Sequence, residues 1–273
     1  MKAVMSEVQE FTRRVVRNVE RVIVGKTSVV QLTIIGLLSR GHLLIEDVPG
    51  VGKTMLARSL ARSLDCSFGR IQFTPDMLPS DVTGVSVYNQ ATGSFEFQPG
   101  PIMSQIVLID EINRATPKTQ SALLEAMQEQ QVTVGEKTRP LEQPFLVLAT
   151  QNPIEQEGTY PLPEAQLDRF MFMVNIGYPK REEERLIVKT TTMEMQNEPQ
   201  SVLTGQEIKR LQSIVRKIPV SDHVVDYAVN LVRATRPKEE GSPAFVRDWL
   251  TWGAGPRAAQ YLSLIHISEP TRP

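Results

Sequence analysis

The residues with the clearest chemical capacity form the run Pro49-Gly50-Val51-Gly52-Lys53-Thr54. It follows an apolar run and opens a segment, 55–64, with the composition of a helix. Strand, glycine loop, Lys-Thr and helix is the layout of a phosphate-binding loop, in which backbone N–H groups and the positive end of the helix dipole face the anion. Lys53 can reach the β- and γ-phosphates, and the Thr54 hydroxyl suits Mg²⁺. The plainer alternative is a helix start with a surface lysine, since Asp47 stands where the full motif has a glycine.

A tandem acid pair supplies the second chemical element. Asp110-Glu111 follows an apolar run, 106–109, of the kind expected for a strand buried on both faces, and Asn152 follows a second such run. Carboxyl ends of parallel strands meet where ligands bind, so we expect these residues to converge with Lys53. Asp110 can hold Mg²⁺ through water, Glu111 can polarise an attacking water, and Asn152 can orient that water or contact the γ-phosphate. Solvated surface acids and an Asn-Pro turn are the alternatives.

Two arginines are candidates for contacts with phosphate. Arg169 precedes the last predicted strand, where it is either a helix-end arginine that caps carbonyls or a finger supplied to the nucleotide of a neighbouring copy. Arg257 stands at a predicted helix start, which is the unfavourable end of the helix dipole for a cation. That misfit favours a functional role, in which Arg257 reaches the phosphates of its own chain.

The elements that would position these residues alternate between strand and helix, which predicts an α/β fold with a parallel sheet. Two interrupting segments have the alternation and loop composition of β-hairpins, within 82–97 and 132–140. From residue 179 onward the pattern is helical only. Predicted strands are 43–45, 71–73, 106–109, 145–149 and 171–174, and predicted helices are 5–22, 29–38, 55–64, 118–130, 181–189, 205–218, 221–234 and one beginning at 255–257.

This pattern divides the chain into four parts. Residues 1–40 are N-terminal helices that lead into the core, 41–178 form the core, and 179–262 form a helical lid domain. Residues 263–273 break the helical pattern that precedes them and are expected to be a non-native tail.

Composition limits the class of protein. A chain of 273 residues, 41% of them hydrophobic, can bury one sizeable core with a small second domain. The net charge of −1 gives no general electrostatic case for nucleic acid or membrane. One cysteine and three dispersed histidines exclude a disulfide framework and show no metal-ligand spacing. A polar N-terminus and the lack of an apolar run of about 18 residues predict a cytoplasmic protein without a membrane span.

In the order and wording of its motifs, the sequence from about residue 5 to 262 resembles the MoxR-type AAA+ ATPases. The resemblance is carried by segments 23–25, 46–54, 109–115, 149–155, 162–170 and 255–258. It implies an AAA+ P-loop core and a lid whose last helices are incomplete here. The implied roles are Walker A and nucleotide contacts at Gly50, Val51, Gly52, Lys53, Thr54 and Met55, Walker B at Asp110 and Glu111, sensor 1 at Asn152, an arginine finger at Arg169, sensor 2 at Arg257, and adenine contacts at Ile23 and Val24.

The same resemblance implies Mg²⁺-dependent ATP hydrolysis in a ring of identical copies, a hexamer by analogy. It also implies that ATP turnover remodels or matures protein targets, with a von Willebrand A-domain partner or insertion of a metal cofactor as possibilities. Arg114 is a second, weaker candidate for a contact with a neighbouring copy. Two alternatives stay open: a nucleic-acid-processing AAA+ motor, disfavoured by the near-neutral charge, and a nucleotide-gated scaffold with little turnover, disfavoured by the intact acid pair.

Overall fold

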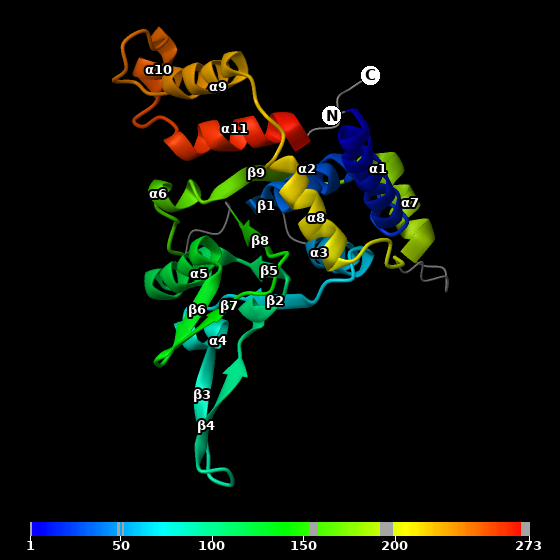
Figure 1. Cartoon of the computed structure of the whole chain (residues 1–273), viewed down its shortest axis with the longest axis vertical. Helices are drawn as coiled ribbons and strands as arrows, with labels where there is room; N and C mark the ends of the chain where they lie inside the picture. The colour runs from blue at the N-terminus through cyan, green and yellow to red at the C-terminus, as the bar shows by residue number, and fades with distance from the viewer. Residues whose placement is uncertain (1, 48–49, 51, 153–157, 192–198, 269–273) are drawn as a thin grey trace.

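The fold is described from a computed structural model. It describes residues 2–47, 50, 52–152, 158–191 and 199–268. Five strands form the central sheet and all of their pairings are parallel, which confirms the parallel sheet that the sequence predicts (Figure 1). Their order, which the sequence does not predict, is β2-β5-β8-β1-β9. These strands are β2 (Phe68–Gln72), β5 (Ile106–Asp110), β8 (Leu146–Gln151), β1 (His42–Asp47) and β9 (Phe170–Ile176).

Both faces of the central strands β5 and β8 are buried, which explains their continuous apolar runs. Along β5, Ile106 and Leu108 belong to one hydrophobic cluster and Val107 and Ile109 to the other. Successive side chains of a strand point to opposite faces, so each run must be apolar throughout. The first cluster packs under α1 (Lys2–Val19), α2 (Thr27–Ser39), α3 (Lys53–Ser63) and α8 (Gly205–Val215), and the second under α5 (Pro117–Glu129).

Both predicted hairpins are present. β3 (Gly84–Asn89) pairs antiparallel with β4 (Ser94–Pro99), and this hairpin projects from the body of the molecule (Figure 1). β6 (Gln131–Val134) pairs with β7 (Lys137–Pro140). The guanidinium carbon of Arg139 in β7 lies 3.9 Å from the centre of the Phe97 ring in β4, so the two hairpins are in contact.

The helical part has two locations. Helix α8 lies against α2, where Gln212 donates a 2.6 Å hydrogen bond to the Leu37 carbonyl. Helices α9 (Asp222–Ala234), α10 (Ala244–Trp249) and α11 (Pro256–Ser268) lie together at the end opposite the projecting hairpin, and α11 also contacts α2 and α8 (Figure 1). Whether 179–262 behaves as one lid domain therefore stays a prediction. The remaining short helices are α4 (Pro79–Thr83), η1 (Pro101–Met103), η2 (Ile112–Arg114), α6 (Glu164–Leu167) and α7 (Arg181–Thr191).

One prediction about the C-terminus is wrong. The sequence pattern predicts that helical structure fails after Leu262, whereas α11 runs to Ser268. Tyr261, Leu264 and Ile265 recur at helical spacing, and Leu264 packs against the first hydrophobic cluster, which extends the helix. Among the described residues, no helix is long and apolar enough to cross a membrane.

Candidate nucleotide-binding site

The phosphate-binding loop ends in two glycines with left-handed backbone. Gly50 has φ +85° and Gly52, the N-cap of α3, has φ +87°. A β-carbon at either glycine would meet nothing within 4 Å, so the space in front of this loop is open for a ligand. Glycine at the N-cap has no side chain to cap the helix, so the first N–H groups of α3 are available to an anion in that space. Val51, a predicted nucleotide contact, lies outside the described residues.

A cavity of about 520 Å³ lies against this loop. The structure brings together seven of the predicted site residues there: Gly50, Gly52, Lys53, Thr54, Met55, Asp110 and Glu111. Sequence reasoning missed three further lining residues: Arg58, Arg70 and Gln72. Gln72 lies on the predicted strand 71–73, whereas Arg70 precedes it and belongs to the strand only in the structure, where β2 begins at Phe68.

Asp110 ends β5 and is buried, with 5% of its surface exposed. Its Oδ2 atom lies 2.7 Å from Nε of Arg70 on the neighbouring strand. A buried carboxylate is stabilised by such a charge-assisted bond, because it has lost the solvation of water.

Glu111 is held by its backbone and by its side chain. The backbone is left-handed (φ 58°, ψ 53°), an uncommon conformation for a residue other than glycine, and the Glu111 N–H donates to Oγ1 of Thr150 at 3.0 Å. Its Oε2 accepts from Nε2 of Gln72 at 2.9 Å and lies 3.0 Å from Nε of Arg114. The described contact of Arg114 is thus within its own chain, at the catalytic candidate.

The residues present fit a magnesium ion that is completed by phosphate. Thr54 offers a hydroxyl and Asp110 a carboxylate on the same cavity, beside the open loop. Among the described residues no group of three or more His, Cys, Asp or Glu could hold a metal alone. Mg²⁺ commonly takes one or two protein oxygens together with substrate phosphates and water, which matches this donor set.

Asn152 immediately follows β8, the strand between β5 and β1, and is partly buried. It is not among the residues that line the cavity, although the preceding Gln151 donates to Glu46 of β1 at 2.6 Å. Its sensor role stays a prediction, as do the adenine contacts. Ile23 is buried in the first cluster and Val24 is partly exposed.

The loop that carries Ile23 and Val24 packs against the start of α7 and the residues just before it. Neither Ile23 nor Val24 lines the phosphate cavity. Lys26 donates to the Gly177 carbonyl at 2.9 Å. At Gly25 the backbone is left-handed (φ +72°), which favours glycine, and the carboxylate of Glu183 in α7 occupies the space beside its α-carbon.

Comparisons with known proteins assign the family. Residues 42–172 match the model of the "ATPase family associated with various cellular activities (AAA)". The chain is 48% identical to the chaperone MoxR1 of Mycobacterium tuberculosis over 90% of its own length and 65% of that protein. It belongs to the MoxR family of AAA+ ATPases.

Two further proteins, one matched by sequence and one by structure, are similar over most of the chain. The uncharacterized protein YeaC of Bacillus subtilis is 50% identical over 86% of the chain and 73% of YeaC. A crystal structure from Cytophaga hutchinsonii superimposes with a TM-score of 0.89 at 42% identity, covering 97% of this chain and 81% of that one.

Arg169 and Arg257, the two arginines predicted to contact phosphate in this MoxR-family chain, lie away from the phosphate cavity. Arg169 lines a separate hollow of about 250 Å³ beside α5, with Gln166, Ser121, Glu125, Gln128 and Glu129. Nη1 of Arg257 lies 3.5 Å from the Asp168 carbonyl, the outer limit of a hydrogen bond. Neither side chain lines the cavity formed by the glycine loop, so their roles as finger and sensor stay predictions.

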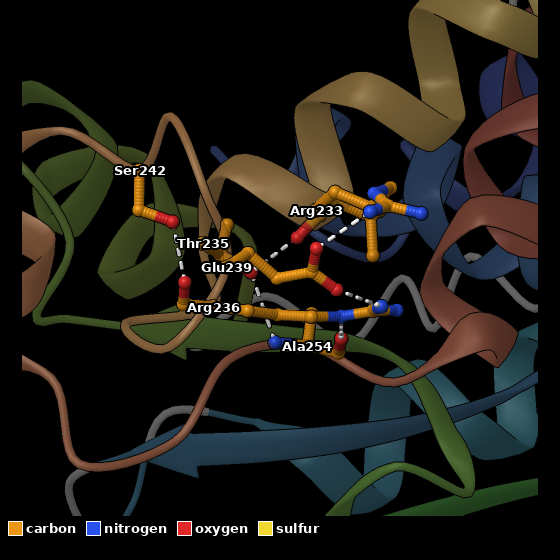
Figure 2. A network of polar contacts seen from close by, with 7 residues as sticks. Arg233, Thr235, Arg236, Glu239, Ser242 and Ala254 are labelled. Carbon is orange, nitrogen blue, oxygen red and sulfur yellow. Dashed lines mark hydrogen bonds and ion pairs between the residues drawn. The ribbon is translucent and has the colours of Figure 1, made fainter.

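A polar network fixes the backbone just before α11, and thus the start of the helix that carries Arg257 (Figure 2). Nε of Arg236 donates to the Ala254 carbonyl at 3.1 Å, and the Ala254 N–H donates to Oγ1 of Thr235 at 2.9 Å. Glu239 braces Arg236 at 3.3 Å and Arg233 at 2.6 Å. Both hydrogen-bonding groups of Ala254 are therefore held by the end of α9 and the turn that follows it.

Proposed function

We propose that this MoxR-family protein binds ATP in the cavity at the glycine loop and hydrolyses it. The observation that carries the proposal is the convergence of an open glycine loop, Lys53, Thr54 and two acids on one 520 Å³ cavity at the carboxyl edge of the sheet. Family membership supports nucleotide binding, and the acid pair supports turnover.

In the proposed reaction the backbone N–H groups of the loop and the ammonium of Lys53 bind the phosphates and stabilise the negative charge that develops during transfer. Glu111 orients the attacking water by accepting a hydrogen bond from it. The strained backbone and the Thr150 contact fix where the Glu111 side chain begins. Mg²⁺, held by Thr54 and Asp110, would polarise phosphate oxygens.

We further propose that the active form is a ring of identical copies, a hexamer by family resemblance. Arg169 lies beside α5 and away from its own phosphate cavity, which supports delivery of its guanidinium to a neighbour. The work done by the ring is remodelling or maturation of a protein target, in line with the chaperone name of the MoxR1 relative. A von Willebrand A-domain protein is the proposed partner class.

The variant Glu111→Gln tests the proposed role of the acid. The amide keeps the size of the side chain but cannot accept a proton, so we expect ATP affinity within about threefold of wild type and turnover lowered about 100-fold or more. Binding is measured with a fluorescent ATP analogue and turnover by phosphate release.

Glu136→Gln, in the turn between β6 and β7, is the matched control and should leave both quantities unchanged. Equal losses of binding and turnover in Glu111→Gln would remove Glu111 from the catalytic role. Wild-type protein that binds ATP but shows no turnover when assembled would instead support the scaffold alternative.

A further inference from the structure

A line of side chains connects the two acids of the site by way of β2. Arg70 and Gln72 are two residues apart, so both point to the same side of that strand, and Gln72 is in register with Asp110 of β5. Nε of Arg70 lies 2.7 Å from Asp110, Nη2 of Arg70 donates to Oε1 of Gln72 at 3.3 Å, and Nε2 of Gln72 donates to Glu111 at 2.9 Å.

The two ends of the Arg70–Asp110 ion pair differ in exposure. The Asp110 side chain is 7% exposed, whereas that of Arg70 is 50% exposed. The acid is therefore fixed in the protein, and the guanidinium reaches it from the solvent side of the cavity. An arginine in this position can move away at little cost in packing, because half of its side chain already lies in water.

The geometry points to Arg70 as a positioning residue that competes with the divalent cation for Asp110. The inference rests on the proposed function, in which Asp110 is a metal ligand. A guanidinium 2.7 Å from Oδ2 occupies the side of the carboxylate that faces the cavity, and a divalent cation there would repel it. Coordination of a metal ion by Oδ2 therefore requires Arg70 to leave that oxygen.

Displacement of Arg70 has a consequence for the catalytic acid. Arg70 orients the Gln72 amide through its Oε1, and that amide contacts Glu111. When Arg70 moves, Gln72 loses one of the contacts that hold it. Metal binding at Asp110 therefore loosens the Gln72 amide that contacts Glu111. The displaced guanidinium stays in a cavity where phosphate oxygens are suitable acceptors.

The test measures metal affinity directly, without turnover. Mn²⁺ is titrated into the ADP complex and free Mn²⁺ is followed by electron paramagnetic resonance. We expect Arg70→Gln to bind Mn²⁺ about fivefold more tightly than wild type, because the competing charge is gone, and Arg70→Lys to stay within about twofold of wild type.

Arg58→Gln is the matched control, since it removes one positive charge from the same cavity without removing the contact to Asp110. Unchanged or weaker Mn²⁺ binding in Arg70→Gln would overturn the inference, and so would equal tightening in Arg58→Gln, which would show a general charge effect.

A second measurement uses thermal unfolding. Loss of Arg70 leaves the buried Asp110 carboxylate without this cation, so Arg70→Gln should melt below wild type in EDTA and gain more in Tm from added Mn²⁺. An equal Tm gain in both proteins would contradict the inference.

The titrations are repeated without nucleotide, and ADP affinity is first measured in EDTA. A protein that binds no ADP counts against the proposed function. A protein that binds ADP while Arg70→Gln leaves Mn²⁺ affinity unchanged counts against the Arg70 inference alone.

Discussion

At the scale of single residues, the structure separates groups that hold a ligand from groups that hold the protein. Asp110 and Glu111 are adjacent, yet Asp110 is buried against Arg70 and Glu111 is turned by its left-handed backbone toward Gln72 and Arg114. Two acids in sequence thus have different surroundings, which is what a division into metal ligand and base requires.

His42 shows the opposite case, a buried titratable group at the other end of β1. Its Nδ1 accepts from the Val147 N–H at 3.1 Å, so Nε2 carries the proton and faces the Met127 carbonyl at 3.4 Å. Burial lowers the pKa of His42 to about 4, and the bond to Met127 opposes that shift.

We predict an acid-dependent loss of stability that His42 controls. Because its folded-state pKa is lowered, the neutral ring contributes stability fully above about pH 6.5, and this contribution is lost as the pH falls toward 4. Between pH 7.5 and 4.5 the loss is about 2–3 kcal/mol in the free energy of unfolding. Urea unfolding of wild type and His42→Gln across this range measures it, and the difference between the two profiles isolates the histidine from the carboxylates. Parallel profiles would contradict the prediction.

At the scale of elements, the start of α11 depends on its brace. Arg236 is the side chain that holds the Ala254 carbonyl, three residues before Arg257, and Arg233 shares Glu239 with it without contacting Ala254 (Figure 2). The pair offers a variant and its control within one network.

We predict that Arg236→Ala lowers ATP turnover about tenfold, because a lost charge-assisted bond of about 1–1.5 kcal/mol lets the α11 start move. Arg233→Ala should change turnover less than about twofold. Turnover and thermal stability are measured together, so that unfolding is not mistaken for misplacement. Equal effects of the two variants on turnover would remove Arg236 from a role in positioning Arg257.

The sequence predicted the site where the chemistry depends on strand ends. The glycine loop and the acid pair follow apolar runs, and a parallel sheet brings such ends together whatever the strand order. Arg70 and Gln72 were missed because their importance depends on β2 lying next to β5, which no local pattern states. Helix α10 was missed because six residues are too few to show a helical period. The continuation of α11 was missed because its packing against the core lies far away in sequence.

At the scale of the whole molecule, we propose that the site is completed by a neighbouring copy. The phosphate cavity contains Lys53 and both acids, whereas Arg169 lies in a separate hollow beside α5. If Arg169 is the proposed finger, it can reach only the phosphates of a neighbouring copy, so we expect turnover to depend on assembly.

The most direct measurement is ATP turnover per subunit against protein concentration, with sizing of the same samples in ATP and Mg²⁺. We predict that turnover per subunit rises as the ring assembles. Arg169→Ala should assemble normally but turn over at least about 100-fold more slowly, whereas Arg185→Ala on the exposed face of α7 should match wild type. Rings mixed from Arg169→Ala and Lys53→Ala subunits should recover part of the activity, because each supplies the group that the other lacks. Constant turnover per subunit from monomer to ring, or no recovery in mixed rings shown to co-assemble, would show that no neighbouring copy completes the site.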